Sequence, residues 1–181
     1  GWLNADDRYE PGALLAAGRA FAEHPGALWV TGLCRIVDGE GREIRRFVKA
    51  YKRFLLRRYS RRLLITQNFI QCPATFIRAD GLRRIGPLDE RFGYSMDYDL
   101  WLRLAKLGDP VVVDEELAWF TMTEGTLSMS GFETQFREHA QNAREHGDGH
   151  PVAVAANAVV SRAIVLAYRA MRAARRRATG T

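Results

Sequence analysis

Two acidic segments contain the residues of this sequence that are best suited to chemistry. The first is the loop Asn4-Ala5-Asp6-Asp7, which places an amide and two carboxylates on four consecutive residues. Oxygen ligands at this density suit Mg²⁺ or Mn²⁺, above all an ion that also binds phosphate oxygens. The alternative is a polar loop before a helix, in which Asp7 or Glu10 caps the helix. On these residues alone, the two interpretations have equal weight.

The second segment holds Asp97 and Asp99. Two residues apart on a helix, their side chains point to different sides, so they do not form an acid/base dyad. One of them can act as a lone general base, because a carboxylate in the first turn of a helix stays ionised near neutral pH. The alternative is plain helix capping. Asp99 and Arg103 have the spacing of a structural salt bridge along one helix face.

The acidic loop should lie between a strand end and a helix. Pro11 suits the first position of a helix that runs to about Glu23. The side chains expected to face inward from this helix are Leu14, Leu15, Ala17 and Phe21. Residues 27–37 then alternate as a strand. One face of this strand should hold Leu28, Val30, Cys34 and Ile36.

The second acidic segment should begin a helix over about 96–107, capped by Ser95 and ended by Gly108. Its buried stripe is expected to be Leu100, Leu104 and Leu107. Before it, residues 69–78 suggest a strand that Pro73 interrupts, which is typical of a sheet edge. The remaining expected elements are a short helix near 79–85, a short strand at Val111–Val113 and a helix over 131–146. Helices that alternate with strands indicate an α/β fold.

The charge of the chain is concentrated in two segments. Of 27 Lys and Arg residues, ten lie in 42–62 beside only one acid, Glu43, and six lie in 152–181 beside none. The rest of the chain is acidic, with eleven bases against twenty acids after subtraction from the totals of 27 and 21. The 181 residues are 47% hydrophobic, which excludes a wholly disordered chain. Cys34 and Cys72 have no metal-ligand spacing, and we expect two buried thiols.

Both basic segments have the pattern of amphipathic helices. In 42–62 the apolar side chains recur every three or four residues, and Arg and Lys fill the positions between. This pattern fits a membrane-surface helix or a docked helix with a solvated basic face. The chain should then pass through a linker at 147–151 into 152–177. Asn157, Arg162 and Arg169 interrupt that last segment, so we expect it to lie in a membrane interface rather than to span the bilayer.

Four segments, in this order, resemble those of family 2 glycosyltransferases, the inverting enzymes with a GT-A fold. The loop at 2–14 resembles their metal-binding Asp-any-Asp loop, and 71–78 is similar to the segment before their acceptor site. Residues 85–92 and 96–105 resemble their catalytic-base motif. The resemblance covers about 1–128. It implies a partial, Rossmann-like GT-A fold over 1–146 that lacks its N-terminal half, plus the basic helix over 152–181. We therefore expect a fragment of a larger protein.

The resemblance also implies roles for individual residues. Asn4, Asp6 and Asp7 would bind the nucleotide-sugar donor, with Asp6 as ligand of Mg²⁺ or Mn²⁺. Asp97 would be the general base that removes the proton of the acceptor hydroxyl. The acceptor, a saccharide or a lipid-linked molecule, would contact Trp101 and Thr75. A core position for Trp101 is an equal alternative.

This sequence differs from the family pattern at two points. Asn4 stands where Asp is commoner, and Thr121 and Thr123 replace a frequent Arg-any-His element. The expected function is inverting, metal-assisted sugar transfer of the hexosyltransferase type, as in cell-envelope polysaccharide biosynthesis. The expected location is cytoplasmic, peripheral at the inner face of the membrane. The alternatives are a non-catalytic module derived from a transferase and a basic nucleic-acid-binding domain. The acidic body and the absence of a reader motif argue against nucleic acid.

Overall fold

The computed structural model describes residues 1–123 and 131–179, with side chains up to Ala170. Within these residues it is an α/β fold with one four-stranded mixed sheet and seven α-helices. The strands are β1 (Arg8–Tyr9), β2 (Trp29–Val37), β3 (Thr75–Ile77) and β4 (Val111–Thr121), in the spatial order β1-β4-β2-β3. β2 and β4 are parallel, and each outer strand is antiparallel to its neighbour. The expected α/β class is confirmed.

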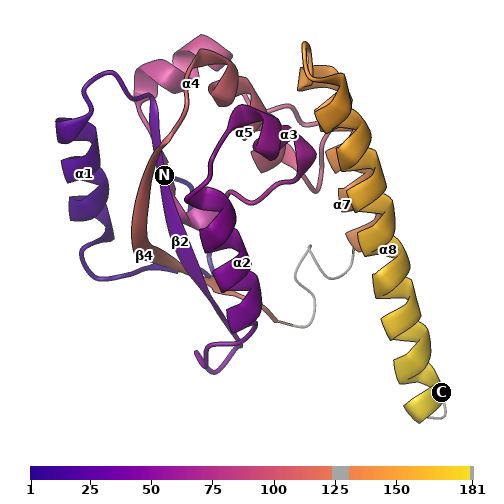
Figure 1. The fold of residues 1–181 in the computed structure, drawn as a ribbon. Coiled ribbons are helices and arrows are strands. Elements are labelled where there is room, and N and C mark those ends of the chain that lie inside the picture. The colour runs from indigo at the N-terminus through magenta and orange to yellow at the C-terminus, as the bar shows by residue number, and fades with distance from the viewer. Residues whose placement is uncertain (124–130, 180–181) are drawn as a thin grey trace.

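Helix α1 (Ala13–Glu23) covers one face of the sheet, but with a different side from the one expected (Figure 1). Its buried residues are Ala13, Ala17 and Ala20, whereas Leu14 and Leu15 are 64% and 59% exposed. The small alanine side chains pack against the cluster around Cys34, Leu117 and Ala118. Pro11 lies before the helix rather than in its first turn. The predicted inward leucines and the predicted helix start are therefore wrong.

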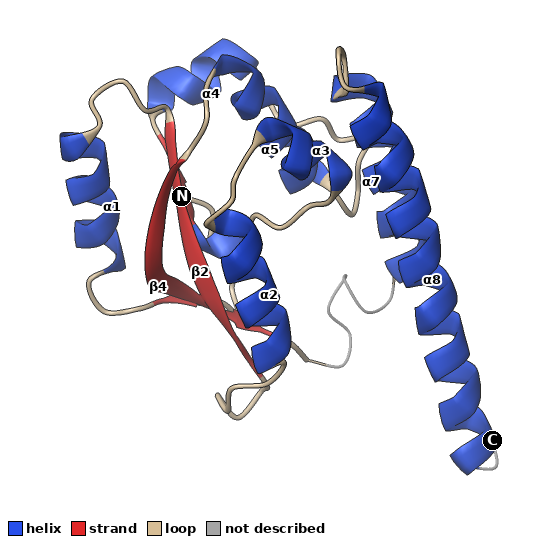
Figure 2. Ribbon diagram, in the orientation of Figure 1, coloured by secondary structure: helices blue, strands red, loops and turns tan. Residues whose placement is uncertain are grey.

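The central strand β2 separates two hydrophobic clusters. Leu33 and Trp29 belong to the large cluster on the side of the sheet opposite α1. Cys34 belongs to the smaller cluster between the sheet and α1. The register against β4 shifts between Thr31 and Cys34. Nearly every residue of β2 is buried, because both faces of the sheet are covered (Figure 2). The strand predicted at 27–37 is confirmed.

The first basic segment forms two helices, α2 (Arg46–Leu56) and α3 (Arg61–Thr66). Ion pairs connect the polar side of α2 to the rest of the fold, and its arginines remain exposed. Lys49 binds Glu43 and Glu116, and Arg53 and Arg57 bind Asp114. These acids lie on β4 or just before α2. Docking of the helix is confirmed, and so is its solvated basic face, since Arg53 and Arg57 are 47% and 57% exposed.

Pro73 breaks the predicted strand at 69–78 into the 3₁₀ helix η1 (Cys72–Ala74) and the edge strand β3. The predicted short helix follows as α4 (Ala79–Ile85). The predicted helix over 96–107 is α5 (Met96–Leu107), which ends at Gly108. Leu100 and Leu104 are buried as predicted. Leu107, the last residue of the helix, is 38% exposed, so the prediction that it is buried is wrong.

The last two helices pack against each other and against α3 and α5. They are α7 (Phe132–His146), as predicted for 131–146, and α8 (Pro151–Thr179). Asn157 of α8 donates to the carbonyl of Ile65 at 2.9 Å and to the Tyr98 hydroxyl at 3.3 Å, which ties α8 to α3 and α5. β4 extends well beyond the predicted Val111–Val113. Residues 124–130, 180 and 181 and the arginine side chains of 172–177 lie outside the described part.

The buried His139 of α7 should make the free energy of unfolding sensitive to acid. It is 8% exposed, lies 4.9 Å from the Tyr98 ring, and burial lowers its pKa to about 3. The unfolded chain binds this proton below about pH 6.5 and the folded chain does not, so stability is lost as pH falls from that value towards 3. We expect this residue alone to reduce the free energy of unfolding by about 2 kcal/mol at pH 5.

Urea unfolding at several pH values tests this prediction. His139→Leu should flatten the acid side of the profile, while His24→Gln, which changes an exposed histidine, should leave it as in the wild type. The same slope in wild type and His139→Leu would contradict the assignment.

Candidate functional site

The Asn4–Asp7 loop lies against the end of β4. The Asp7 carboxylate accepts hydrogen bonds from Asn4 Nδ2 at 3.0 Å and from the backbone N–H of Thr121 at 2.9 Å. Burial raises the pKa of Asp7, and these two hydrogen bonds partly offset the effect. Thr121 Oγ1 also donates to the carbonyl of Asp6 at 2.6 Å. Thr121 therefore fixes the backbone of the acidic loop.

The two aspartates of this loop are in different situations. Both Asp7 oxygens are engaged within the protein, whereas the exposed Asp6 carboxylate accepts no hydrogen bond from the described residues. In the described part of the chain, no group of three or more His, Cys, Asp or Glu side chains can hold a metal ion. The residues fit an ion such as Mg²⁺ that takes one carboxylate and completes its coordination with phosphate and water. Asp6 is the residue that would hold such an ion.

Asp97 lies half-buried in the first turn of α5, where its Oδ1 accepts the backbone N–H of Tyr98 at 2.8 Å. Burial raises the pKa of Asp97 above its ordinary value. The Tyr98 N–H, Lys52, Asn68 and Trp101 act in the opposite direction and partly offset that rise. The result is a carboxylate that is more basic than an ordinary aspartate, with a cation and two polar side chains beside it.

The fold brings the two acidic segments into one electrostatic environment. Burial raises the pKa of the Cys72 thiol, and nearby Asp97 and Asp7 raise it further. Cys72 lies in η1, so the charges of both acidic segments act on this short helix. Burial likewise raises the pKa of Cys34 to about 12. Both cysteines are free thiols, as predicted, with Cys34 buried and Cys72 half-buried.

Lys52 is a member of this site that the sequence analysis did not single out. Burial lowers its pKa, and the negative charge of Asp97 acts against that lowering. Lys52 is on α2, about one turn from the buried Leu55 and Leu56. The sequence signal for Lys52 was its position near the inward side of α2. It is one of ten basic residues in that segment, so the sequence did not distinguish it from the others.

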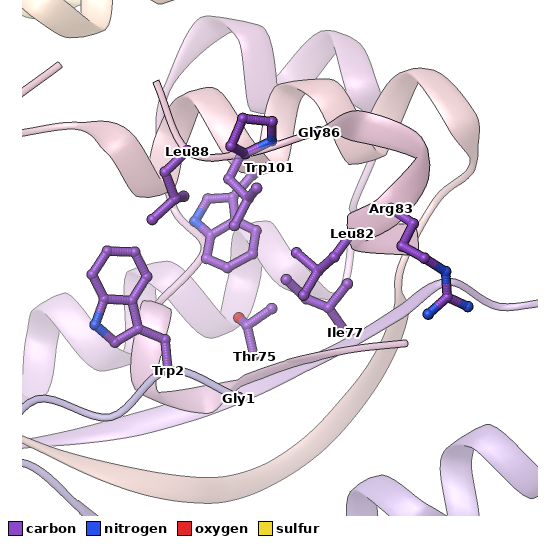
Figure 3. Close-up of a pocket in the computed structure, with 11 residues that line it drawn as sticks. Gly1, Trp2, Thr75, Ile77, Leu82, Arg83, Gly86, Leu88 and Trp101 are labelled. Atoms are coloured by element: carbon purple, nitrogen blue, oxygen red, sulfur yellow. The ribbon is translucent and has the colours of Figure 1, made fainter. Parts of the chain in front are cut away.

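The two predicted acceptor residues line one apolar pocket of about 520 Å³ (Figure 3). Its side chains include Trp2, Ile77, Leu82 and Leu88 in addition to Thr75 and Trp101. A volume in this range accommodates a small organic ligand. Trp101 is also a core residue, since it is 1% exposed and stacks on Trp29 with ring centroids 5.8 Å apart.

Thr75 reaches the same pocket with its hydroxyl already engaged. Its Oγ1 lies 3.0 Å from the Thr31 hydroxyl and donates to the carbonyl of Gln71 at 2.9 Å. The side chain is 1% exposed. Thr75 therefore contributes to the shape of the pocket floor, and a hydrogen bond to a ligand would require it to leave one of these partners.

Helix α7 holds the start of α5 in place through three polar residues on one face. Glu138 accepts hydrogen bonds from the Tyr94 N–H at 2.8 Å and the Ser95 hydroxyl at 3.1 Å. Asn142 donates to Ser95 Oγ at 2.9 Å. Ser95 is thus at the N-cap position, but its side chain does not cap α5 as predicted, because Glu138 and Asn142 engage it instead.

The third polar residue of α7 is His146, whose Nε2 lies 2.7 Å from Asp99 Oδ1. The other Asp99 oxygen accepts two hydrogen bonds from Arg103, at 2.8 and 2.5 Å. The predicted Asp99–Arg103 salt bridge is confirmed. Asp97 and Asp99 therefore face different surroundings, as their spacing predicts.

Comparison with models of known protein families gives no match, and comparison with functionally curated proteins gives no significant match. The assignment of function therefore rests on the site and on the motifs.

Proposed function

We propose that this chain is the C-terminal part of a GT-A domain and that the domain is an inverting glycosyltransferase. The observation that carries the proposal is the position of Asp97, a half-buried carboxylate of raised pKa beside Lys52. The acidic loop that contains Asp6 and Asp7 is close enough to share the environment of Cys72. A general base works best when its pKa is near the working pH, and the environment of Asp97 moves its pKa in that direction.

In this mechanism Asp97 accepts the proton of an acceptor hydroxyl. The oxygen then forms a bond to the anomeric carbon of the donor sugar as the bond to the nucleoside diphosphate breaks, which inverts the configuration. Asp6 would hold Mg²⁺ or Mn²⁺, which supplies positive charge for the departing diphosphate. Asn4 and Asp7 shape the donor side of the site, and Trp101 and Thr75 form part of the acceptor side.

The acceptor class that we propose is a saccharide or a lipid-linked saccharide, used at the cytoplasmic face of the membrane. Helix α8 supports a membrane location, because Pro151–Ala170 is long and apolar enough to cross a bilayer by length and composition, although the sequence interruptions favour an interface. Only 17% of that window is buried in the fold. The ion pairs that occupy Lys49, Arg53 and Arg57 weigh against a nucleic-acid function for α2.

A donor screen tests the proposed transfer. Release of nucleoside diphosphate from a panel of nucleotide sugars would be measured with Mn²⁺ or Mg²⁺, on this chain and on any longer form of the protein. We expect release from one donor class, a fall to background with a chelator, and recovery when the metal is restored. A longer form that releases no nucleoside diphosphate from any donor would refute the proposal, and equal rates with chelator would refute the role of the metal.

A further inference from the structure

The outward face of α2 is apolar, which is unusual for a docked helix. Phe47, Tyr51 and Phe54 are 77%, 48% and 51% exposed and lie at positions i, i+4 and i+7. A docked surface helix normally turns its apolar stripe towards the core. Here the opposite charged side is occupied by ion pairs with Glu116 and Asp114. An exposed aromatic stripe of this kind indicates a surface that binds a partner.

The surroundings of this stripe are cationic. Arg45, Arg58 and Arg62 are exposed, and none of them forms an ion pair within the described part of the chain. The Arg58 guanidinium lies over the Phe54 ring, 3.9 Å from its centroid. The sequence contains no Asp or Glu between residues 44 and 79. We call Phe47, Tyr51, Phe54, Arg58 and Arg62 the aromatic-cationic face.

A second helix on the same side of the sheet has a similar composition. Val152, Val159 and Leu166 of α8 are 73%, 66% and 63% exposed at seven-residue intervals, and residues 152–181 contain no acid. In Figure 1, α2 and α8 both lie on the side of the sheet opposite α1. Two helices that expose apolar side chains and contain no acidic residues therefore lie on one side of the sheet (Figure 1).

Helix α1 gives a contrast within the same protein. It exposes Leu14 and Leu15 on the other side of the sheet, where Arg19 and Glu23 balance each other. Exposed leucines alone do not distinguish an interaction surface from ordinary surface. Helix α1 exposes no aromatic ring, so it lacks the combination of exposed rings and unpaired arginines found on the α2 side.

We propose that the aromatic-cationic face binds the surface of an anionic lipid bilayer. Aromatic rings insert at the headgroup level, and arginine side chains extend their charges to the lipid phosphates. The three rings lie on α2, Arg58 follows the end of that helix and Arg62 lies on α3, so two consecutive helices form this exposed face. The inference rests on the membrane location proposed above and does not depend on sugar transfer.

Vesicle co-sedimentation tests this inference. The chain should bind vesicles of phosphatidylcholine and phosphatidylglycerol, bind pure phosphatidylcholine weakly, and be released by high salt. Phe47→Ser/Phe54→Ser should weaken binding by about tenfold or more, because two exposed rings lose their apolar contact. Arg58→Glu/Arg62→Glu should weaken it by about tenfold or more through lost attraction to anionic lipid.

The matched control is Leu14→Ser/Leu15→Ser, which removes two exposed leucines from the opposite side and should bind as the wild type does. Circular dichroism would establish that each variant is folded. Unchanged binding in Phe47→Ser/Phe54→Ser would overturn the proposal. So would self-association or duplex DNA binding that replaces vesicle binding. Because no donor sugar is present, failure here is distinct from failure of the transfer reaction.

Discussion

Asp97→Asn should reduce sugar transfer by about 10²–10⁴-fold while the fold is retained, the range expected for loss of a general base. Asparagine has nearly the same shape and can still accept the Tyr98 N–H, but it cannot take a proton from the acceptor hydroxyl. The effect should therefore be on turnover. The measurement is the initial rate of nucleoside diphosphate release in the longest available form, with the donor identified in the screen.

The matched control for this variant is Asp148→Asn, which removes an 82% exposed carboxylate paired with Lys106 at the opposite end of α5 from Asp97. It should leave the rate unchanged. In the wild type, the base must be ionised, so the rate should fall as pH drops through the raised pKa of Asp97, above the range of an ordinary aspartate. Lys52→Met should move this acid limb to still higher pH, because it removes a cation that favours ionised Asp97. An Asp97→Asn enzyme with wild-type turnover would remove the catalytic assignment.

Local patterns were sufficient to predict several features of the fold. The spacing of the leucines predicted α5, the spacing of Asp99 and Arg103 predicted their ion pair, and Pro73 predicted an edge or irregular stretch, which is found as η1 and the edge strand β3. Each of these depends on residues that are close in sequence. Short-range rules of propensity, spacing and proline geometry act at that range.

The errors arose where partners are distant in sequence. A stripe such as Phe47, Tyr51 and Phe54 has the same period whether it faces the core or the solvent. In the fold the basic side of α2 lies towards Asp114 and Glu116, more than 55 residues further along the chain, and the aromatic stripe faces away from them. In α1 the alanines, rather than the larger leucines, face the sheet, because small side chains allow the helix to approach the sheet closely. Neither outcome is encoded in the local period.

The candidate site shows the same division. Asp6, Asp7 and Asp97 could be predicted from motifs, but their common environment depends on η1 and on the packing of α5. Lys52 and Glu138 could not be predicted as site residues. Each lies on a helix with many other charged residues. Only tertiary packing determines which of these residues reaches the site.

The second large effect is on stability, at Asp99. Asp99→Ala should lower the free energy of unfolding by about 3–5 kcal/mol, the cost of breaking a buried ion pair. Asp99 is 2% exposed, and its loss leaves the Arg103 guanidinium and the His146 ring without their carboxylate. Burial acts to raise the pKa of Asp99, but His146 and Arg103 outweigh it and hold the pKa below the ordinary value. The stability that this residue gives is thus present above about pH 4 and lost as pH falls through the lowered pKa.

Asp114→Ala is the matched control, because Asp114 binds Arg53 and Arg57 at similarly short distances but is 40% exposed. An exposed pair contributes about 0–1 kcal/mol, so this variant should unfold at nearly the wild-type denaturant midpoint. The difference in the free energy of unfolding between the two variants would then follow from the burial of the aspartate, and not from the length of its hydrogen bonds. Equal midpoints for Asp99→Ala and Asp114→Ala in urea at neutral pH would show that the Asp99 ion pairs are solvated, and α5 would need another anchor to hold Asp97 in place.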